Sequence, residues 1–164
     1  LHWRYVEAPY ISYTLIELRS DHVLEGFAVV RVQETAVGSV LRIMELIAST
    51  KWRNTAFQGL VLYAEQMGAL FSDFFVIGSS HTQALIQAGF VEPNEDNGLN
   101  DLPHLLSPVE HREWSKTFHL GGDLIKGSSS WSFAERIYFT KGDSDRDWPT
   151  SYQIKEEPKP ISLR

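Results

Sequence analysis

Alternating apolar and polar positions mark three strand-forming segments in the first third of the chain. The pattern predicts strands over residues 12–19, 23–32 and 40–48, with residues 33–39 as the turn between the last two. In the third segment, Leu41, Ile43 and Ile47 are the expected inward-facing apolar side chains. The order predicts an antiparallel meander.

The apolar spacing becomes helical near Arg53 and stays so up to Gly68, which is placed to end the helix in a left-handed conformation. Residues 72–77 are almost wholly apolar, as in a buried parallel strand. Ser80 and Gln83 have the spacing of a capping box and predict a second helix that ends at Gly89. The first helix is expected to bury Phe57, Leu60, Val61, Ala64 and Met67.

Beyond residue 91 the chain is more polar, and residues 131–140 form the last segment with an alternating pattern. We therefore expect one domain over residues 1–140 and an extended tail over residues 141–164. The element order predicts an α/β fold: a mixed, mostly antiparallel sheet with one parallel strand pair and flanking helices.

Composition narrows the possible functions. The chain has 164 residues, enough for one domain with a core, and a formal charge of -6, which disfavours nucleic-acid binding. Its apolar runs are too short to span a membrane, so we expect no membrane-spanning segment. The sequence contains no cysteine, which fits a reducing, cytoplasmic location.

Metal and hydrolase motifs are incomplete. Asp143, Asp145 and Asp147 begin like a calcium loop, but Trp148 and Ile154 stand where glycine and glutamate are needed. The histidines lack the close spacing of metal ligands, and no G-x-S-x-G motif is present. We expect no metal site and interpret the aspartates as a polar turn.

The order of elements, with Gly89-Phe90 closing the second helix, resembles the GNAT acyltransferase fold over residues 12–92. In this resemblance residues 40–48 correspond to the family's fourth strand and residues 72–77 to its fifth. The family's first strand and first two helices have no counterpart in the chain. A missing N-terminal segment or another chain is therefore expected to complete the sheet.

The resemblance implies acetyl-CoA or another acyl-CoA as cofactor. Backbone groups of the fourth strand, near Leu46 and Ile47, would contact the thioester and pantetheine. The next helix would receive the diphosphate at its first turn. The family's glycine-rich loop is replaced by residues 49–56, which contain no glycine. The candidate diphosphate contacts there are Lys51, Arg53, Asn54 and Thr55, and the alternative is that the two cations are simply solvated.

The resemblance also implies transfer of an acyl group to a small-molecule amine. Leu85 occupies the position of the family's proton-donating tyrosine and cannot transfer a proton. Glu45, between Met44 and Leu46, is the candidate general base; alternatively it faces solvent or pairs with Arg42. Two functions remain open: a CoA-dependent N-acyltransferase, or a non-catalytic binding module that has lost CoA.

Overall fold

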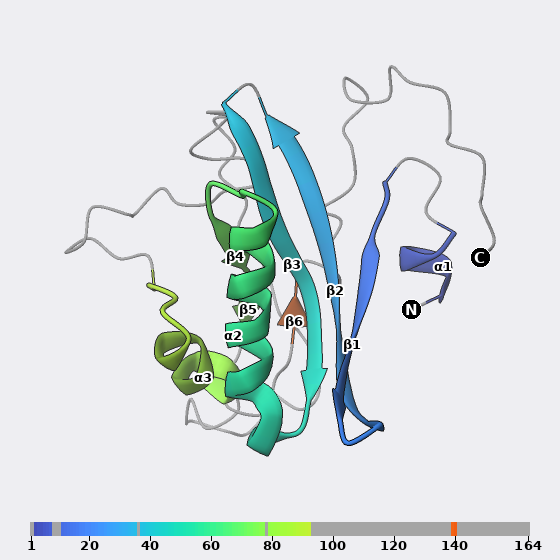
Figure 1. Ribbon diagram of the computed structural model, residues 1–164, viewed down its shortest axis with the longest axis vertical. Helices are drawn as coiled ribbons and strands as arrows, with labels where there is room; N and C mark the ends of the chain where they lie inside the picture. The colour runs from blue at the N-terminus through green and yellow to red at the C-terminus, as the bar shows by residue number, and fades with distance from the viewer. Residues whose placement is uncertain (1, 8–10, 36, 78, 93–138, 141–164) are drawn as a thin grey trace, which may run out of the picture.

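The computed structural model describes residues 2–7, 11–35, 37–77, 79–92 and 139–140 (Figure 1). These residues form an α/β fold with one four-stranded and one two-stranded sheet. The elements in chain order are α1 (His2–Tyr5), β1 (Thr14–Ser20), β2 (Val23–Thr35), β3 (Gly38–Ala48), α2 (Thr50–Gln66), β4 (Ser72–Phe74), β5 (Val76–Ile77), the 3₁₀ helix η1 (Ser79–His81), α3 (Thr82–Gln87) and β6 (Phe139–Thr140).

The larger sheet has the order β1-β2-β3-β4. β1–β2 and β2–β3 are antiparallel, whereas β3 and β4 are parallel and joined by the crossover helix α2. The predicted mixed sheet with one parallel pair is thus confirmed. The predicted strand 72–77 is divided, because β4 ends at Phe74 and β5 pairs with β6 in the second sheet.

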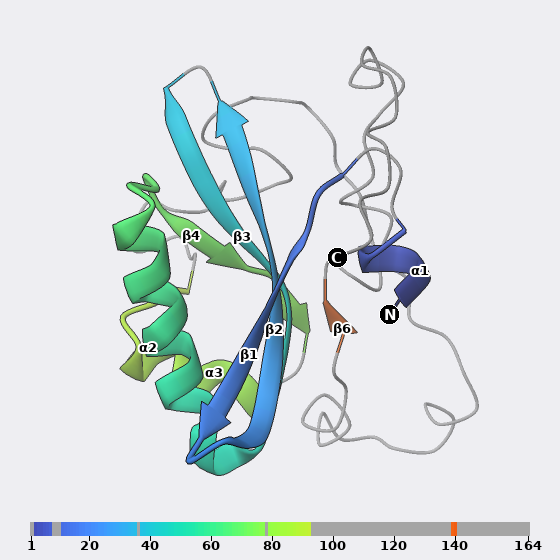
Figure 2. The ribbon, with the colours of Figure 1, turned by 45° about the vertical axis from the view of Figure 1, so that its right-hand side comes forward.

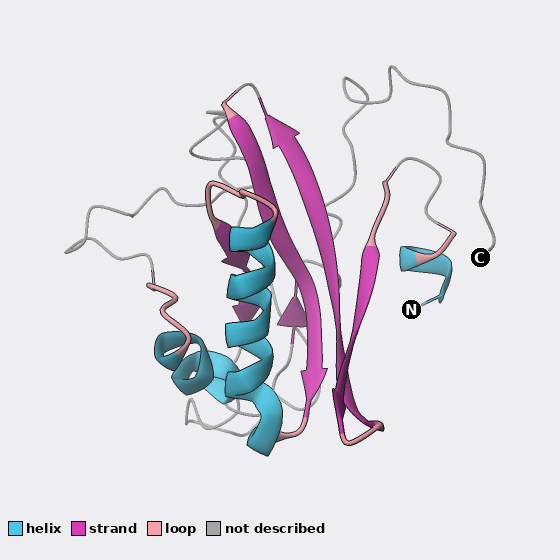
Figure 3. Cartoon of the chain, in the orientation of Figure 1, coloured by secondary structure: helices cyan, strands magenta, loops and turns pink. Residues whose placement is uncertain are grey.

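The larger sheet is covered differently on its two faces. α2 and α3 lie on one face, and α1 and β6 lie on the other (Figures 2 and 3). The main core fills the space between the sheet and α2, where Phe57 is fully buried against strand residues such as Leu41 and Ile43. Burial of the apolar stripe of α2 holds the crossover against the sheet.

A β-bulge in β3 changes the predicted facing of its side chains. Val29 pairs with Glu45 and Val30 with Ile43, so Met44 is an extra residue on β3. After the bulge the alternation is displaced by one position. Leu46 therefore enters the core at 1% exposure, and Ile47, predicted to face inward, is 44% exposed.

The ends of several elements differ from the predictions. The turn predicted over residues 33–39 is shorter, since β2 extends to Thr35 and β3 begins at Gly38. Helix α2 begins at Thr50, one turn earlier than expected, because a first turn needs no apolar side chain. Gly68 has a φ of 67°, which confirms its predicted left-handed conformation, and Gly89, where the second helix was predicted to end, has a φ of 91°.

The predicted capping box at Ser80 is wrong. Residues 79–81 form a 3₁₀ turn, and α3 begins at Thr82 with His81 as its N-cap and no side-chain cap. The Ser80 hydroxyl instead lies 2.9 Å from Nδ1 of His81. Ser80 lies inside the 3₁₀ turn and not at the N-cap position of α3, so its hydroxyl does not cap that helix.

Some predictions fall on residues that the structure does not describe. These are the polar segment after residue 92, the tail over residues 141–164 and the aspartate string of residues 143–147. Of the predicted final strand 131–140, only Phe139–Thr140 is described, and it is a strand. Among the described residues, no helix is long and apolar enough to cross a membrane.

Candidate functional site

Glu45 is buried, with 5% of its surface exposed, on the face of the sheet opposite α2. The bulge at Met44 turns Glu45 toward that face, on which Met44 packs with Tyr5 and Val29. Oε1 of Glu45 accepts a hydrogen bond of 2.8 Å from the Tyr5 hydroxyl and one of 2.9 Å from Thr140 Oγ1. The carboxylate thus connects α1, β3 and β6. The alternative that Glu45 faces solvent is wrong.

Burial raises the pKa of Tyr5 above its usual range, and the hydrogen bond to the Glu45 carboxylate and its negative charge raise it further. Tyr5 therefore remains protonated and donates to Glu45. The Tyr5 ring also packs edge-on against Tyr13, with a centroid distance of 5.0 Å. These contacts suit a stable tie between elements, because a general base needs a carboxylate oxygen open to its substrate.

A second buried polar pair lies on the same face. Arg42 alternates with the core residues Leu41 and Ile43, so it projects away from α2. Its guanidinium lies 3.6 Å from the Asp73 carboxylate, and the two residues are direct neighbours across β3 and β4. Both side chains are almost fully buried. Arg42, which the sequence offered as a partner for Glu45, therefore forms its ion pair with Asp73.

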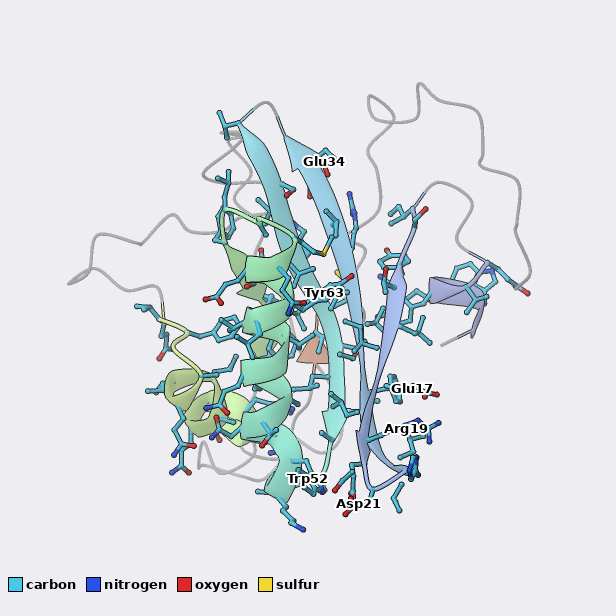
Figure 4. The ribbon with its side chains drawn as sticks, viewed as in Figure 1. Glu17, Arg19, Asp21, Glu34, Trp52 and Tyr63 are labelled. Atoms are coloured by element: carbon cyan, nitrogen blue, oxygen red, sulfur yellow. The ribbon has the colours of Figure 1, made fainter. Side chains whose placement is uncertain are left out.

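The residues predicted to bind a diphosphate lie in the first two turns of α2, but they do not converge. Lys51 is exposed, with its amine 4.6 Å from the Trp52 ring centroid (Trp52 is labelled in Figure 4). Thr55 is exposed. Asn54 is half-buried, and its Oδ1 has no hydrogen-bond partner among the described residues.

Arg53 crosses from α2 to the 3₁₀ turn. Its guanidinium donates a hydrogen bond to the backbone carbonyl of Ser80. This contact ties the start of α2 to η1, two elements that follow β3 and β5 respectively. The Arg53 guanidinium, a candidate diphosphate contact, is therefore already bound to a protein carbonyl.

His81 fills the space beside these residues. It is 4% exposed, and its ring centroid lies 6.0 Å from those of Phe57 and Phe74. Burial lowers the pKa of His81 to about 4, and the charge of Arg53 acts in the same direction; a hydrogen bond to the backbone of Leu46 opposes both. His81 is therefore neutral at pH 7.

The position of His81 bears directly on the expected acyl-CoA site. The pairing of β3 with β4 ends at Ile43 and Phe74, while β3 continues to Ala48. A pantetheine arm would have to pair with β3 beyond this point, and His81 contacts the backbone of Leu46 there. The Leu46 side chain faces the core, and Ile47 is half-exposed. In this arrangement the described residues do not fit the cofactor.

Several of these residues carry no sequence signal. Tyr5 and Thr140 reach Glu45 from positions 40 and 95 residues away, distances that periodicity cannot bridge. His81 is an isolated histidine, and only its packing shows its role. Arg42 and Asp73 are opposite charges on the two strands predicted to be parallel, and this is the signal that could have suggested their pairing. Leu85, which was expected to be unable to transfer a proton, packs against the main core.

No known protein family matches this chain, and neither the curated proteins nor the solved structures include a match. Within the described part of the chain, no group of three or more histidine, cysteine, aspartate or glutamate residues could hold a metal ion.

Proposed function

We propose that this chain is a GNAT-like domain, related in fold to the CoA-dependent N-acyltransferases, that acts as a non-catalytic binding or interaction module. The relationship in fold is supported by the parallel β3–β4 pair, its α2 crossover and the end of their pairing at Ile43 and Phe74. The described part of the chain has the expected order of elements from β1 to α3.

One observation carries the choice of a binding module: His81 is buried against the Phe57 and Phe74 rings and contacts the backbone of Leu46. An extended cofactor arm needs those backbone groups of β3. Arg53 supports the same conclusion, since its guanidinium binds the Ser80 carbonyl. Displacing His81 would expose the Phe57 and Phe74 rings and leave a cavity. The arrangement with His81 in place is therefore favoured.

Glu45 supports the same conclusion. A general base must reach the acceptor's proton directly or through one water. The Glu45 carboxylate instead accepts hydrogen bonds from Tyr5 and Thr140 and is 5% exposed. In a binding module this network has a structural function: it fixes α1 and β6 on the sheet.

The second candidate is acyl transfer from acyl-CoA to an amine acceptor. It is favoured by the end of the β3–β4 pairing, which leaves β3 to continue to Ala48 beyond its parallel partner. The exposed Lys51 near the start of α2 is the candidate diphosphate contact. This activity requires His81 to leave its position.

Thermal unfolding with and without acetyl-CoA tests the proposal. A ligand that binds the native state raises the melting temperature as its concentration rises. The binding module predicts no change for the wild-type chain up to millimolar acetyl-CoA. A concentration-dependent increase, reduced in Lys51→Ala, favours the transferase.

A further inference from the structure

β1 forms one end of the described four-stranded sheet. In an edge strand, alternate backbone N–H and C=O groups point away from the sheet, where they can pair with another strand. Proteins commonly place charged residues on such strands to prevent indiscriminate pairing. β1 carries Glu17 and Arg19, which are about half-exposed and project away from α2 (Figure 4).

An apolar groove of about 250 Å³ lies between β1 and α2. Ile16 and Leu18 line its strand side, and Leu62 and Tyr63 line its helix side together with Gly59. Leu62 is 57% exposed, and a Cβ added at Gly59 would meet nothing within 4 Å. The groove therefore has room for side chains from a neighbouring molecule.

We propose that the edge of β1 and this groove pair with a second copy of the same chain, as an antiparallel two-fold dimer centred on Leu18. A two-fold axis perpendicular to the sheet places both α2 helices on the same face. Leu18 of one chain then lies opposite Leu18 of the other, on the face of the sheet that α2 covers. The two grooves become continuous, with Ile16 and Leu18 of both chains as their floor.

Charge complementarity selects this register. With Leu18 opposite Leu18, Glu17 lies opposite Arg19 of the second chain, and Arg19 opposite its Glu17. Two reciprocal ion pairs form on the face away from α2. A register centred on Glu17 would place two glutamates directly opposite each other, which is unfavourable. Within one chain Arg19 Nε lies 2.7 Å from Glu17 Oε2, which places both charges on this face, so the four charges of the dimer would form one network there.

This inference is independent of whether the chain binds acyl-CoA, because β1 and the groove share no residue with the candidate cofactor site. Association through exposed ion pairs should weaken as salt rises, since salt screens them.

The test uses sedimentation equilibrium of the 164-residue chain, whose monomer mass is 18.7 kDa, over a micromolar concentration range at low salt. The wild type should show a reversible monomer–dimer equilibrium. Glu17→Arg alone and Arg19→Glu alone should each raise the dissociation constant at least about tenfold, because two favourable cross-strand pairs become two unfavourable ones.

Mixing the two single variants provides the matched control. In the mixed dimer, positions 17 and 19 are both positive in the Glu17→Arg chain and both negative in the Arg19→Glu chain. Each position therefore faces an opposite charge across the interface, and both ion pairs are restored. Within each variant chain, however, the two positions keep the same sign of charge. An equimolar mixture should dimerise with nearly the wild-type constant, which damage within a single chain could not produce.

Three results would overturn the proposal. The wild type could remain monomeric at the highest concentration, which would leave the edge to another segment or protein. It could dimerise with the same constant after both charge reversals, which would locate the interface elsewhere. The mixture of variants could fail to associate although both variants retain the wild-type circular dichroism spectrum, which would exclude the Leu18-centred register.

Discussion

The Tyr5 hydroxyl donates a hydrogen bond of 2.8 Å to Oε1 of Glu45, although the two residues lie 40 positions apart in the chain. The bulge at Met44 makes this contact possible, because it turns Glu45 to the face on which α1 lies. Thr140 donates to the same oxygen from β6. The carboxylate therefore holds together three segments that are distant in sequence.

Tyr5→Phe should lower the free energy of unfolding by about 1–3 kcal/mol, because it removes a donor from a buried carboxylate and leaves the ring in place. Urea denaturation measures the change. Tyr63→Phe is the matched control, since the Tyr63 hydroxyl lies at the α2 groove and makes no hydrogen bond among the described residues. Equal effects of the two substitutions would contradict the role given to Tyr5.

The strands and helices follow closely from the sequence, because alternation and helical spacing both report burial on one face. The bulge does not follow. One extra residue in β3 leaves no compositional mark, and Leu46 and Ile47 are equally apolar, so periodicity alone favoured the wrong inward-facing residue. The partners of Glu45 could not be predicted from the sequence either. Arg42 was the opposite charge nearest to Glu45 in the sequence, but in the structure Arg42 pairs with Asp73.

Asp73→Ala should destabilise the fold by about 3 kcal/mol or more, because it leaves the Arg42 guanidinium buried without its carboxylate. Replacing both residues, as Arg42→Met with Asp73→Leu, should recover most of that loss, since apolar side chains of similar size need no partner. Guanidinium denaturation of the two variants measures the difference. A double variant no more stable than Asp73→Ala would show that the buried charge is not the cause.

Stability should fall in acid because of His81. Its pKa is lowered to about 4 in the folded protein, whereas an unfolded histidine has a pKa of about 6.5. Between these pH values the unfolded state binds more protons than the folded state. The contribution of His81 to the free energy of unfolding is therefore complete above about pH 6.5 and is lost as the pH falls toward 4. We expect a loss on the order of 2–3 kcal/mol from this group.

His81→Gln isolates that contribution, because glutamine cannot be protonated in this range. The difference in unfolding free energy between wild type and variant, measured in urea at several pH values, should narrow as pH falls from 7 to 4. A difference that stays constant over this range would mean that His81 has the same pKa in both states.

Two glycines should respond in opposite ways to alanine. Gly59 lies inside α2 with open space where a Cβ would be, so Gly59→Ala should raise stability by about 0.5–1 kcal/mol. At Gly26 the Cβ would clash with the carbonyl oxygen of Ile47 on β3, so Gly26→Ala should destabilise the sheet. Thermal unfolding of both variants provides the comparison, and destabilisation by Gly59→Ala would contradict the open surface beside the groove.

Titration calorimetry with acetyl-CoA at low salt tests whether His81 and Arg53 occupy the place a cofactor would need. We expect no saturable heat for the wild-type chain at millimolar ligand, and none for Lys51→Ala or Arg53→Ala. Saturable binding by the wild type that weakens in both variants would contradict it, because a diphosphate would then be held by the two cations at the start of α2.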